Sequence, residues 1–181
     1  MRTPLVVSLA AGLALAAQLV AGQGKTIQAP LVPPTSRRLA SDFELRDGNG
    51  QPVRLSDSRG SVVLLDFWAT KCGGCVEEIP HLLELKSKYG DELVVVGLHV
   101  GDEEDRAKVP AFVDKLKITY PLAYPDSALT DFVFQTNSGI PQTAVFDRAG
   151  VMIRKIVGFN DEIQAKLDAA VERAIKSGIV D

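Results

Sequence analysis

The chain contains few of the residues that commonly bind metals. Its 181 residues include two cysteines and two histidines, His81 and His99. A structural zinc site takes four ligands, so a zinc site built from these residues is disfavoured. Attachment of a c-type haem needs a histidine directly after the second cysteine of a Cys-x-x-Cys motif, and Val76 occupies that position. We therefore expect no metal and no cofactor.

The chain also lacks a strong excess of charge of either sign. Its 20 lysines and arginines and 23 aspartates and glutamates give a net charge of −3. This balance argues against nucleic acid or an anionic membrane as the main partner. The 46% of hydrophobic residues is enough for an ordinary globular core. The length suggests one domain with extra segments.

Charged residues are almost absent from the beginning of the chain, where Arg2 is the single one in residues 1–22. Residues 5–20 are mostly apolar, and small residues follow them. This pattern predicts a signal peptide or an N-terminal anchor over residues 1–22. We favour cleavage, because the run is short for a membrane-spanning helix of about 20 residues. If it is retained, residues 4–22 would anchor the protein in the membrane.

Three prolines and no periodicity mark residues 23–40 as an extended linker. The folded domain is then expected over residues 41–181. Export would place it outside the cytoplasm, most simply in a periplasm. No cysteine follows the N-terminal apolar run, which excludes a lipoprotein anchor at that point.

Both cysteines lie in one motif, Cys72-Gly73-Gly74-Cys75. The apolar run before it, residues 62–67, predicts a buried strand, and the spacing of apolar residues after it predicts a helix. The motif therefore falls at a helix N-terminus, whose unpaired N–H groups favour a thiolate at Cys72. Cys75 and then Glu78 follow at intervals of three residues on the same face.

A redox-active pair is the favoured interpretation of these two cysteines. Half of a zinc site is disfavoured for want of further ligands. A purely structural disulfide stays open, although a loop this short would add little chain entropy to stability.

The segment Leu65-Asp66-Phe67-Trp68-Ala69-Thr70-x-Cys72-x-x-Cys75 resembles the active-site segment of the thioredoxin superfamily. A distant segment around Ile140-Pro141 resembles the loop whose cis-proline faces the cysteines in that superfamily. Pro80 matches the proline that kinks the active-site helix, and Glu78 matches a glutamate of the TlpA- and ResA-like extracytoplasmic thiol–disulfide oxidoreductases. The resemblance covers roughly residues 40 to 178.

This resemblance implies an α/β, thioredoxin-like fold, with a central mixed sheet flanked by helices, an N-terminal β-hairpin and an inserted helix. The sequence pattern agrees, because apolar strand-like runs alternate with helical periodicity. A hairpin is predicted around Asp47-Gly48-Asn49-Gly50. Further strands are predicted over residues 93–100, 122–124, 142–147 and 151–157, and helices over 105–116, 127–134 and from the N-cap Asn160 to Gly178. Pro110 either interrupts the helix over 105–116 or sets its true first turn.

Two carboxyl groups are candidates for moving the proton of the buried cysteine. Asp66 lies in an apolar strand, where burial should raise its pKa. The resemblance implies that Asp66 and Glu78 relay protons for Cys75 after Cys72 has reacted. The alternatives are that Asp66 faces water at a strand end and that Glu78 is solvated like its neighbour Glu77.

The resemblance also implies residues that contact the substrate. Pro141 would be cis and catalytic, and the backbone of Ile140 would pair with the substrate chain; an ordinary turn proline is the alternative. Gly73, Gly74 and Trp68 would complete the contact, and a plain core role for Trp68 fits equally well. Lys71 departs from the family pattern, which has tryptophan there, and its charge should favour the Cys72 thiolate.

These features predict an exported enzyme that reduces disulfides of partner proteins, with cytochrome c maturation as one setting. Its electrons would come from a thiol protein, expected in the membrane. A disulfide oxidase or isomerase stays open, because direction depends on reduction potentials. A thiol peroxidase and a copper- or haem-handling module are alternatives. The peroxiredoxin pattern Pro-x-x-x-Thr-x-x-Cys and the copper-carrier spacing Cys-x-x-x-Cys are both absent.

Overall fold

A computed structural model describes residues 45–47 and 49–178. The predicted signal peptide or anchor and the linker lie outside the described residues, as does the beginning of the predicted hairpin. Within the described part of the chain, no helix combines the length and the apolar character needed to cross a membrane.

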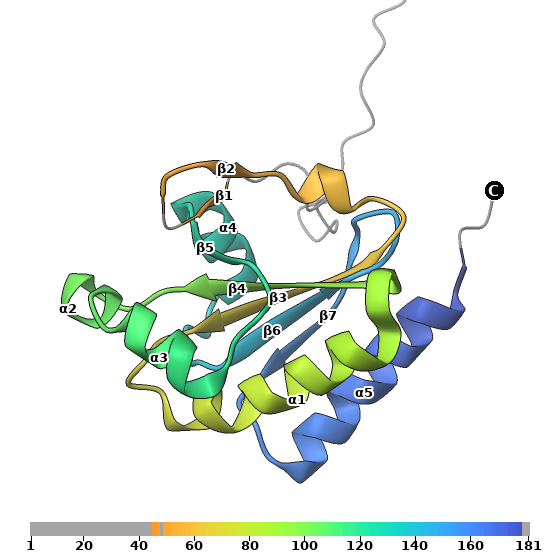
Figure 1. The fold of residues 1–181 in the computed structure, drawn as a ribbon. Helices are drawn as coiled ribbons and strands as arrows, with labels where there is room; N and C mark the ends of the chain where they lie inside the picture. Colours follow the sequence, from red (N-terminus) through yellow and green to blue (C-terminus); the bar gives the residue numbers. More distant parts are fainter. Residues whose placement is uncertain (1–44, 48, 179–181) are drawn as a thin grey trace, which may run out of the picture. The chain divides into compact units, whose positions relative to one another are not determined.

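A mixed sheet of seven strands forms the centre of the fold, in the order β2-β1-β5-β4-β3-β6-β7 (Figure 1). Strands β3, β4 and β5 run parallel to one another, and the other neighbouring pairs are antiparallel. The strands are β1 (Leu45–Asp47), β2 (Pro52–Val53), β3 (Val62–Trp68), β4 (Leu93–His99), β5 (Leu122–Pro125), β6 (Gln142–Phe146) and β7 (Met152–Val157).

Helices cover both faces of this sheet. The longest, α1 and α5, lie next to each other on one face (Figure 1), where His81 of α1 contacts Asp168 of α5 at 2.6 Å. Their face also receives apolar side chains of α3, while α4 packs on the opposite face. The helices are α1 (Gly73–Tyr89), α2 (Glu103–Arg106), α3 (Val109–Leu116), α4 (Ser127–Phe134) and α5 (Asp161–Lys176), with 3₁₀ turns η2 (Leu55–Ser58) and η3 (Gly90–Glu92).

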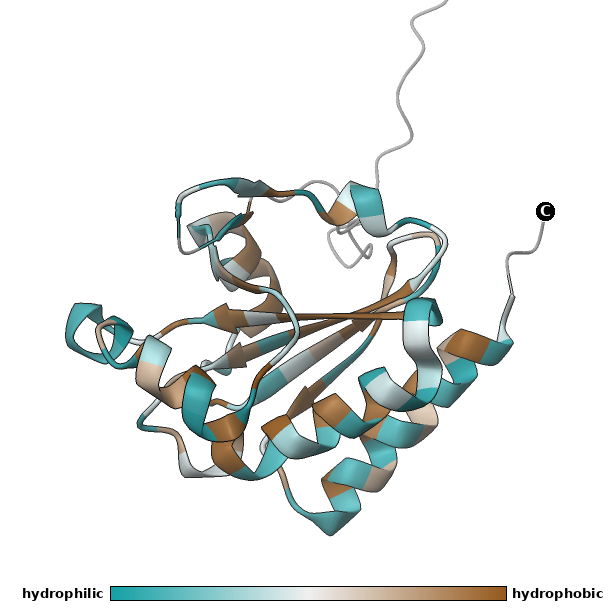
Figure 2. Ribbon diagram, viewed as in Figure 1, coloured by the Kyte–Doolittle hydropathy of each residue, from teal (hydrophilic) through white to brown (hydrophobic). Residues whose placement is uncertain are grey.

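Strand β3 is buried along its whole length, as its continuous apolar run predicts. Successive side chains point to opposite faces, so Val62 and Leu64 pack towards α1 and α5, whereas Val63 and Leu65 pack towards α4. Figure 2 shows the resulting arrangement, with brown hydrophobic strands at the centre and teal residues on the outer sides of the helices. The strand that leads into the cysteines therefore lies in the most constrained part of the fold.

The structure confirms most predicted elements. The sequence predicted a helix over residues 105–116 that Pro110 either interrupts or begins, and the structure has two helices in this region, α2 and α3. Pro110 lies in the first turn of α3, where its missing N–H costs no hydrogen bond. Asp102 caps α2 by accepting a hydrogen bond from the Asp105 amide at 2.7 Å, so this helix begins before the predicted start.

Candidate active site

The two cysteines form a disulfide at the start of α1, and their Cα atoms lie 5.3 Å apart. Cys72 is the N-cap residue, and its Sγ accepts a hydrogen bond from the Cys75 amide at 3.1 Å. Cys72 is partly exposed, whereas Cys75 is fully buried. The sulfur that a partner can reach is therefore also the one held against the positive end of the helix dipole.

Pro141 faces the turn between the cysteines. The Ile140–Pro141 peptide bond is cis, and Pro141 is buried. A Cβ atom on Gly74 would lie only 3.0 Å from Pro141 Cδ, so the two chain segments are in close contact. Ile140 packs in the same small cluster as both cysteines. The structure thus brings together Cys72, Cys75 and the two residues of the distant loop.

Two buried carboxyl groups lie on the elements that carry the site, Asp66 on β3 and Glu78 on α1, one turn after Cys75. Asp66 and Glu78 are each 1% exposed, so neither is the solvated side chain that the sequence left as an alternative. The Thr143 hydroxyl donates a hydrogen bond to Glu78 Oε1 at 2.6 Å. Both oxygens of Asp66 lack a hydrogen-bond partner among the described residues. Asp66 is therefore a buried acid without a fixed donor.

This environment favours the protonated forms of both acids. Burial raises the pKa of Asp66 well above its ordinary value, and the nearby charge of Glu78 raises it further. Burial also raises the pKa of Glu78 to about 7, although the hydrogen bond from Thr143 acts in the opposite direction. The pair can therefore hold or release a proton near neutral pH, as a proton acceptor for a thiol requires.

Tyr120 is a further residue of this buried site, and the sequence analysis did not identify it. Its hydroxyl lies close enough to Asp66 to lower the pKa of that acid, yet it forms no hydrogen bond of ordinary geometry with the described residues. Tyr120 precedes β5 and lies 54 positions after Asp66 in the chain. The contact between Tyr120 and Asp66 depends on how β3, β4 and β5 pair in the sheet, and the sequence alone does not give that register.

Trp68 lies in the core beside the disulfide. It is fully buried and clusters with Cys75 and Val109. Its ring stacks on Phe112 at a centroid distance of 5.1 Å and meets the His99 ring edge-on at 5.2 Å. A side chain with no exposed surface cannot touch a partner in this conformation, which favours the core role over substrate contact.

A second polar network holds the loop before Cys72. The Thr70 amide donates to Asp105 Oδ2 at 2.8 Å, and the Thr70 hydroxyl donates to Oδ1. His99 Nε2 also contacts Asp105 Oδ2 at 2.8 Å. His99 and Asp105 are 4% and 2% exposed, so His99 is a buried histidine held by a carboxylate. Asp105 was missed, because its partners come from two other segments of the chain.

Lys71 does not act on Cys72 alone. Its ammonium group lies 3.6 Å from Glu104 Oε1 and 3.9 Å from Asp102 Oδ2. These carboxylates offset the positive charge that the sequence analysis assigned to thiolate stabilisation. The pairs are exposed, so they contribute little to stability.

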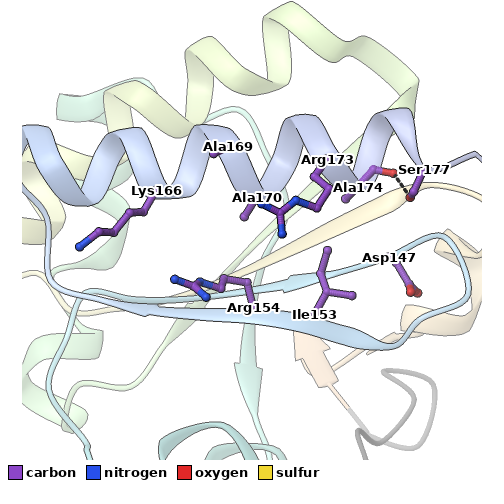
Figure 3. Close-up of a pocket in the computed structure, with 9 residues that line it drawn as sticks. All are labelled: Asp147, Ile153, Arg154, Lys166, Ala169, Ala170, Arg173, Ala174 and Ser177. Carbon is purple, nitrogen blue, oxygen red and sulfur yellow. Dashed lines mark hydrogen bonds between the residues drawn. The ribbon is translucent and has the colours of Figure 1, made fainter.

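A groove with a volume of about 520 Å³ lies elsewhere, between β7 and α5. Figure 3 shows Arg154 of β7 and Arg173 of α5 projecting into it. It contains none of the residues of the redox site.

Comparisons with known proteins agree with this geometry. Residues 37–155 match the model of the AhpC/TSA family. The chain is 33% identical over 133 residues to the thioredoxin-like protein YneN of Bacillus subtilis, covering 71% of this chain and 76% of YneN. It is 34% identical over 123 residues to the thiol-disulfide oxidoreductase ResA of Geobacillus kaustophilus, covering 66% of this chain and 67% of ResA.

A comparison with a solved structure also points to the thiol–disulfide oxidoreductases. A Chlorobium tepidum protein assigned as the thiol:disulfide interchange protein DsbE superposes with a TM-score of 0.66 at 28% identity, covering 77% of this chain and 97% of that protein. The shared fold, the paired cysteines at a helix N-terminus and the named relatives lead to one conclusion. This chain belongs to the AhpC/TSA family and is a thiol–disulfide oxidoreductase of the ResA and DsbE type.

Proposed function

We propose that this oxidoreductase acts outside the cytoplasm and reduces disulfides of partner proteins, with cytochrome c maturation as one setting. The observation that carries the proposal is the Cys72–Cys75 pair at a helix N-terminus, in which Cys72 is partly exposed and Cys75 is buried. A pair arranged in this way can attack a partner and then release it. The extracytoplasmic address is supported by the sequence of residues 1–22.

The reductive half of the cycle begins with the dithiol form. The Cys72 thiolate attacks one sulfur of the partner disulfide, and the other partner sulfur leaves as a thiolate that takes up a proton. Cys75 then loses its proton and attacks Cys72 Sγ. This step breaks the mixed disulfide, forms the Cys72–Cys75 disulfide and releases the partner as a dithiol. Two electrons have moved to the partner, and a donor thiol protein, which we place in the membrane, restores the dithiol.

The slow part of this sequence is deprotonation of Cys75, because burial disfavours a thiolate. Asp66 and Glu78 are the groups we assign to accept that proton. The support is the burial of Glu78 on the same helix as Cys75, the burial of Asp66 on the strand that leads to the cysteines, and a pKa of about 7 for Glu78. An acceptor with a pKa near the working pH is present in its basic form often enough to react and can release the proton again.

We assign contact with the partner to the exposed turn and the loop opposite it. Gly73 is exposed and lacks a side chain, and Gly74 lies against Pro141. Ile140 directly precedes the buried Pro141, so its backbone lies at the site where a partner segment would pair. Trp68 supports this surface from within the core.

The reduction potential of the cysteine pair tests the direction of electron flow. Equilibration with glutathione and dithiothreitol buffers should give a value near that of thioredoxin, about −270 mV. A value on the oxidising side of glutathione would replace the reductase by a disulfide oxidase or isomerase. Rapid turnover of hydrogen peroxide by the reduced protein would instead show that the protein is a thiol peroxidase.

Trapping tests the assignment of the two cysteines. Cys75→Ser should accumulate a mixed disulfide between Cys72 and a protein disulfide substrate, because the resolving thiol is absent. Cys72→Ser is the matched control and should form no adduct, since its remaining thiol is buried. Adducts of equal yield in both variants would contradict the assignment.

A further inference from the structure

We propose that the Tyr120 hydroxyl is a third member of the buried proton site and holds negative charge on Asp66 while Cys75 is deprotonated. The proposal rests on the roles proposed above for Asp66 and Glu78. It makes Tyr120 a positioning residue, because it acts on the acid and does not touch the reacting sulfurs.

The sheet register places Asp66 between two other positions in one row. Asp66 pairs with Thr143 of the antiparallel strand β6 and with Gly97 of the parallel strand β4. Residues that pair across neighbouring strands point to the same face of the sheet. The side chains of Thr143 and Asp66, and the empty position at Gly97, therefore face the same side as α1.

Each neighbour of Asp66 brings a different group to the site. On the Thr143 side the group is Glu78, which accepts the Thr143 hydroxyl bond. On the Gly97 side three side chains approach: a Cβ atom on Gly97 would lie 2.6 Å from Leu122 Cδ2, 2.9 Å from Trp68 Nε1 and 3.0 Å from Tyr120 Cε2, and Tyr120 is the one of the three that carries a hydroxyl. That ring carbon is bonded to the carbon bearing the hydroxyl. The phenol thus shares, with Leu122 and Trp68, the space that a side chain at position 97 would need.

The Tyr120 hydroxyl has no other partner to explain its position. Tyr120 is 5% exposed, and its oxygen lacks a hydrogen-bond partner among the residues that the structure describes. The oxygens of Asp66 are unpartnered in the same way. Unpaired buried polar groups are uncommon in folded proteins, and a catalytic role is one of the explanations for them. Ionisation of Asp66 would draw the phenol into a charge-assisted hydrogen bond.

The phenol stays a donor throughout. Burial raises the pKa of Tyr120, and the charges of Asp66 and Glu78 raise it further. A carboxylate on Asp66 therefore finds an O–H group, as Glu78 does in Thr143. With one hydroxyl donor for each acid, neither carboxylate is left without a donor when the pair carries a single negative charge. Removal of the phenol would raise the pKa of Asp66 further, so that fewer molecules carry the Asp66 carboxylate at a given pH and the charge is concentrated on Glu78.

Tyr120→Phe tests the inference, because it removes the hydroxyl and keeps the ring against Gly97. Resolution of the mixed disulfide should slow about fivefold on the acidic side of the pH–rate profile, as expected for loss of one hydrogen bond. The rate should recover at higher pH, where Asp66 ionises without help. Tyr89→Phe, at the far end of α1 from the cysteines, is the matched control and should leave the profile unchanged.

A double-mutant cycle separates this role from general packing. Tyr120→Phe should have no further effect on the resolution rate in an Asp66→Asn background, because no charge remains to be stabilised. An equal slowing in both backgrounds, or a Tyr120→Phe profile that superimposes on that of the wild type, would overturn the inference. Wild-type protein without any thiol–disulfide exchange would overturn the proposed function instead.

NMR of the wild type gives a test that does not depend on the folding of a variant. With ¹³C-labelled tyrosine, the three ring signals can be followed from pH 5 to 9. The Tyr120 Cζ signal should move with the titration of the carboxyl pair, whereas the Tyr89 signal should not. A Tyr120 signal that is flat across this range would contradict the inference.

Discussion

At the scale of single residues, Glu78 links protonation of the site to stability. Its pKa is about 7 in the folded chain against 4.5 for the unperturbed group. The folded state therefore binds this proton more tightly than the unfolded state does. The stabilisation is complete below about pH 4.5 and is lost as pH rises through 7, with a total of about 3 kcal/mol.

Glu78→Gln should remove this pH dependence, because glutamine resembles the protonated acid and can still accept the Thr143 bond. We expect the variant to match the wild type near pH 4.5 and to be the more stable protein at pH 8. Urea unfolding of the oxidised protein at both pH values measures the difference. The exposed neighbour Glu77→Gln is the control and should change neither value. If the wild type is more stable than Glu78→Gln at pH 8, burial does not raise the pKa of Glu78 as described.

The two glycines of the motif should respond differently to replacement by alanine. Open space surrounds the Cβ position of Gly73, whereas that of Gly74 lies 3.0 Å from Pro141 Cδ. Gly73→Ala should stabilise the oxidised protein by about 0.5–1 kcal/mol, the usual gain in a helix. Gly74→Ala should cancel that gain or reverse it, because the proline ring cannot yield as a flexible chain does.

Thermal unfolding of the two variants side by side measures the difference. Both replacements gain the same helix propensity, so the difference between them isolates the contact with Pro141. Equal stabilisation by both alanines would mean that the turn moves away from Pro141 at little cost.

At the scale of elements, α2 holds the loop that leads to Cys72. Burial alone would raise the pKa of Asp105, but the bonds from Thr70 and His99 lower it to about 2. Because the pKa of Asp105 is lower in the folded state, its carboxylate stabilises the fold above about pH 4, and this stabilisation is lost as pH falls towards 2. Asp105→Ala should cost about 2–4 kcal/mol at neutral pH, because it leaves the Thr70 amide and hydroxyl and His99 without their acceptor.

Glu103→Ala is the matched control for this prediction, because Glu103 lies on the same helix and is exposed. Urea unfolding at pH 7 and pH 3 measures both variants. The difference in unfolding free energy between Asp105→Ala and the wild type should be smaller at pH 3 than at pH 7. A cost below about 0.5 kcal/mol at pH 7, the range of ordinary surface changes, would show that the network is dispensable.

The elements were foreseeable where local pattern alone decides them. The apolar run of β3, the N-cap Asn160 of α5 and the Gly-rich turn at the cysteines each act through neighbours in the chain. The sequence left open whether Pro110 interrupts the helix predicted over residues 105–116 or sets its first turn, because proline fits both positions. The structure places it in the first turn of α3, after a separate α2. The order and register of the strands in the sheet depend on contacts between distant parts of the chain, which no local pattern shows.

Contacts of the site show the same limit. The sequence indicated that Asp66 is buried, since its strand is apolar on both sides. It did not show that the gap at Gly97 admits Tyr120, because this needs β3, β4 and the start of β5 in register. Asp105 likewise reaches Thr70 across 35 positions. Groups that complete a site from another element leave no local signal.

At the scale of the whole molecule, the disulfide should matter more for electron transfer than for holding the fold together. Two separate cores, one on each face of the sheet, supply the packing. The disulfide spans a sequence separation of 3, and closing so short a loop is worth at most about 2 kcal/mol. The reduced protein and a Cys72→Ser/Cys75→Ser variant should therefore stay folded.

Stability and reduction potential are linked by a thermodynamic cycle. The difference in unfolding free energy between the oxidised and reduced forms equals the difference in potential between the folded and the unfolded cysteine pair. For two electrons, about 1.4 kcal/mol corresponds to about 30 mV. A reductase requires the oxidised form to be the more stable one, so its folded pair should be more reducing than its unfolded pair by no more than about 40 mV.

Urea unfolding with and without dithiothreitol gives the difference in unfolding free energy between the oxidised and reduced forms. Redox equilibration in native and denaturing buffers gives the difference in reduction potential between the folded and unfolded cysteine pair. The double serine variant is the control, because dithiothreitol should not change its stability. A reduced form that unfolds at room temperature would make the disulfide structural. A reduced form more stable than the oxidised one would mean that folding drives electrons onto this pair, and the enzyme would then oxidise its partners.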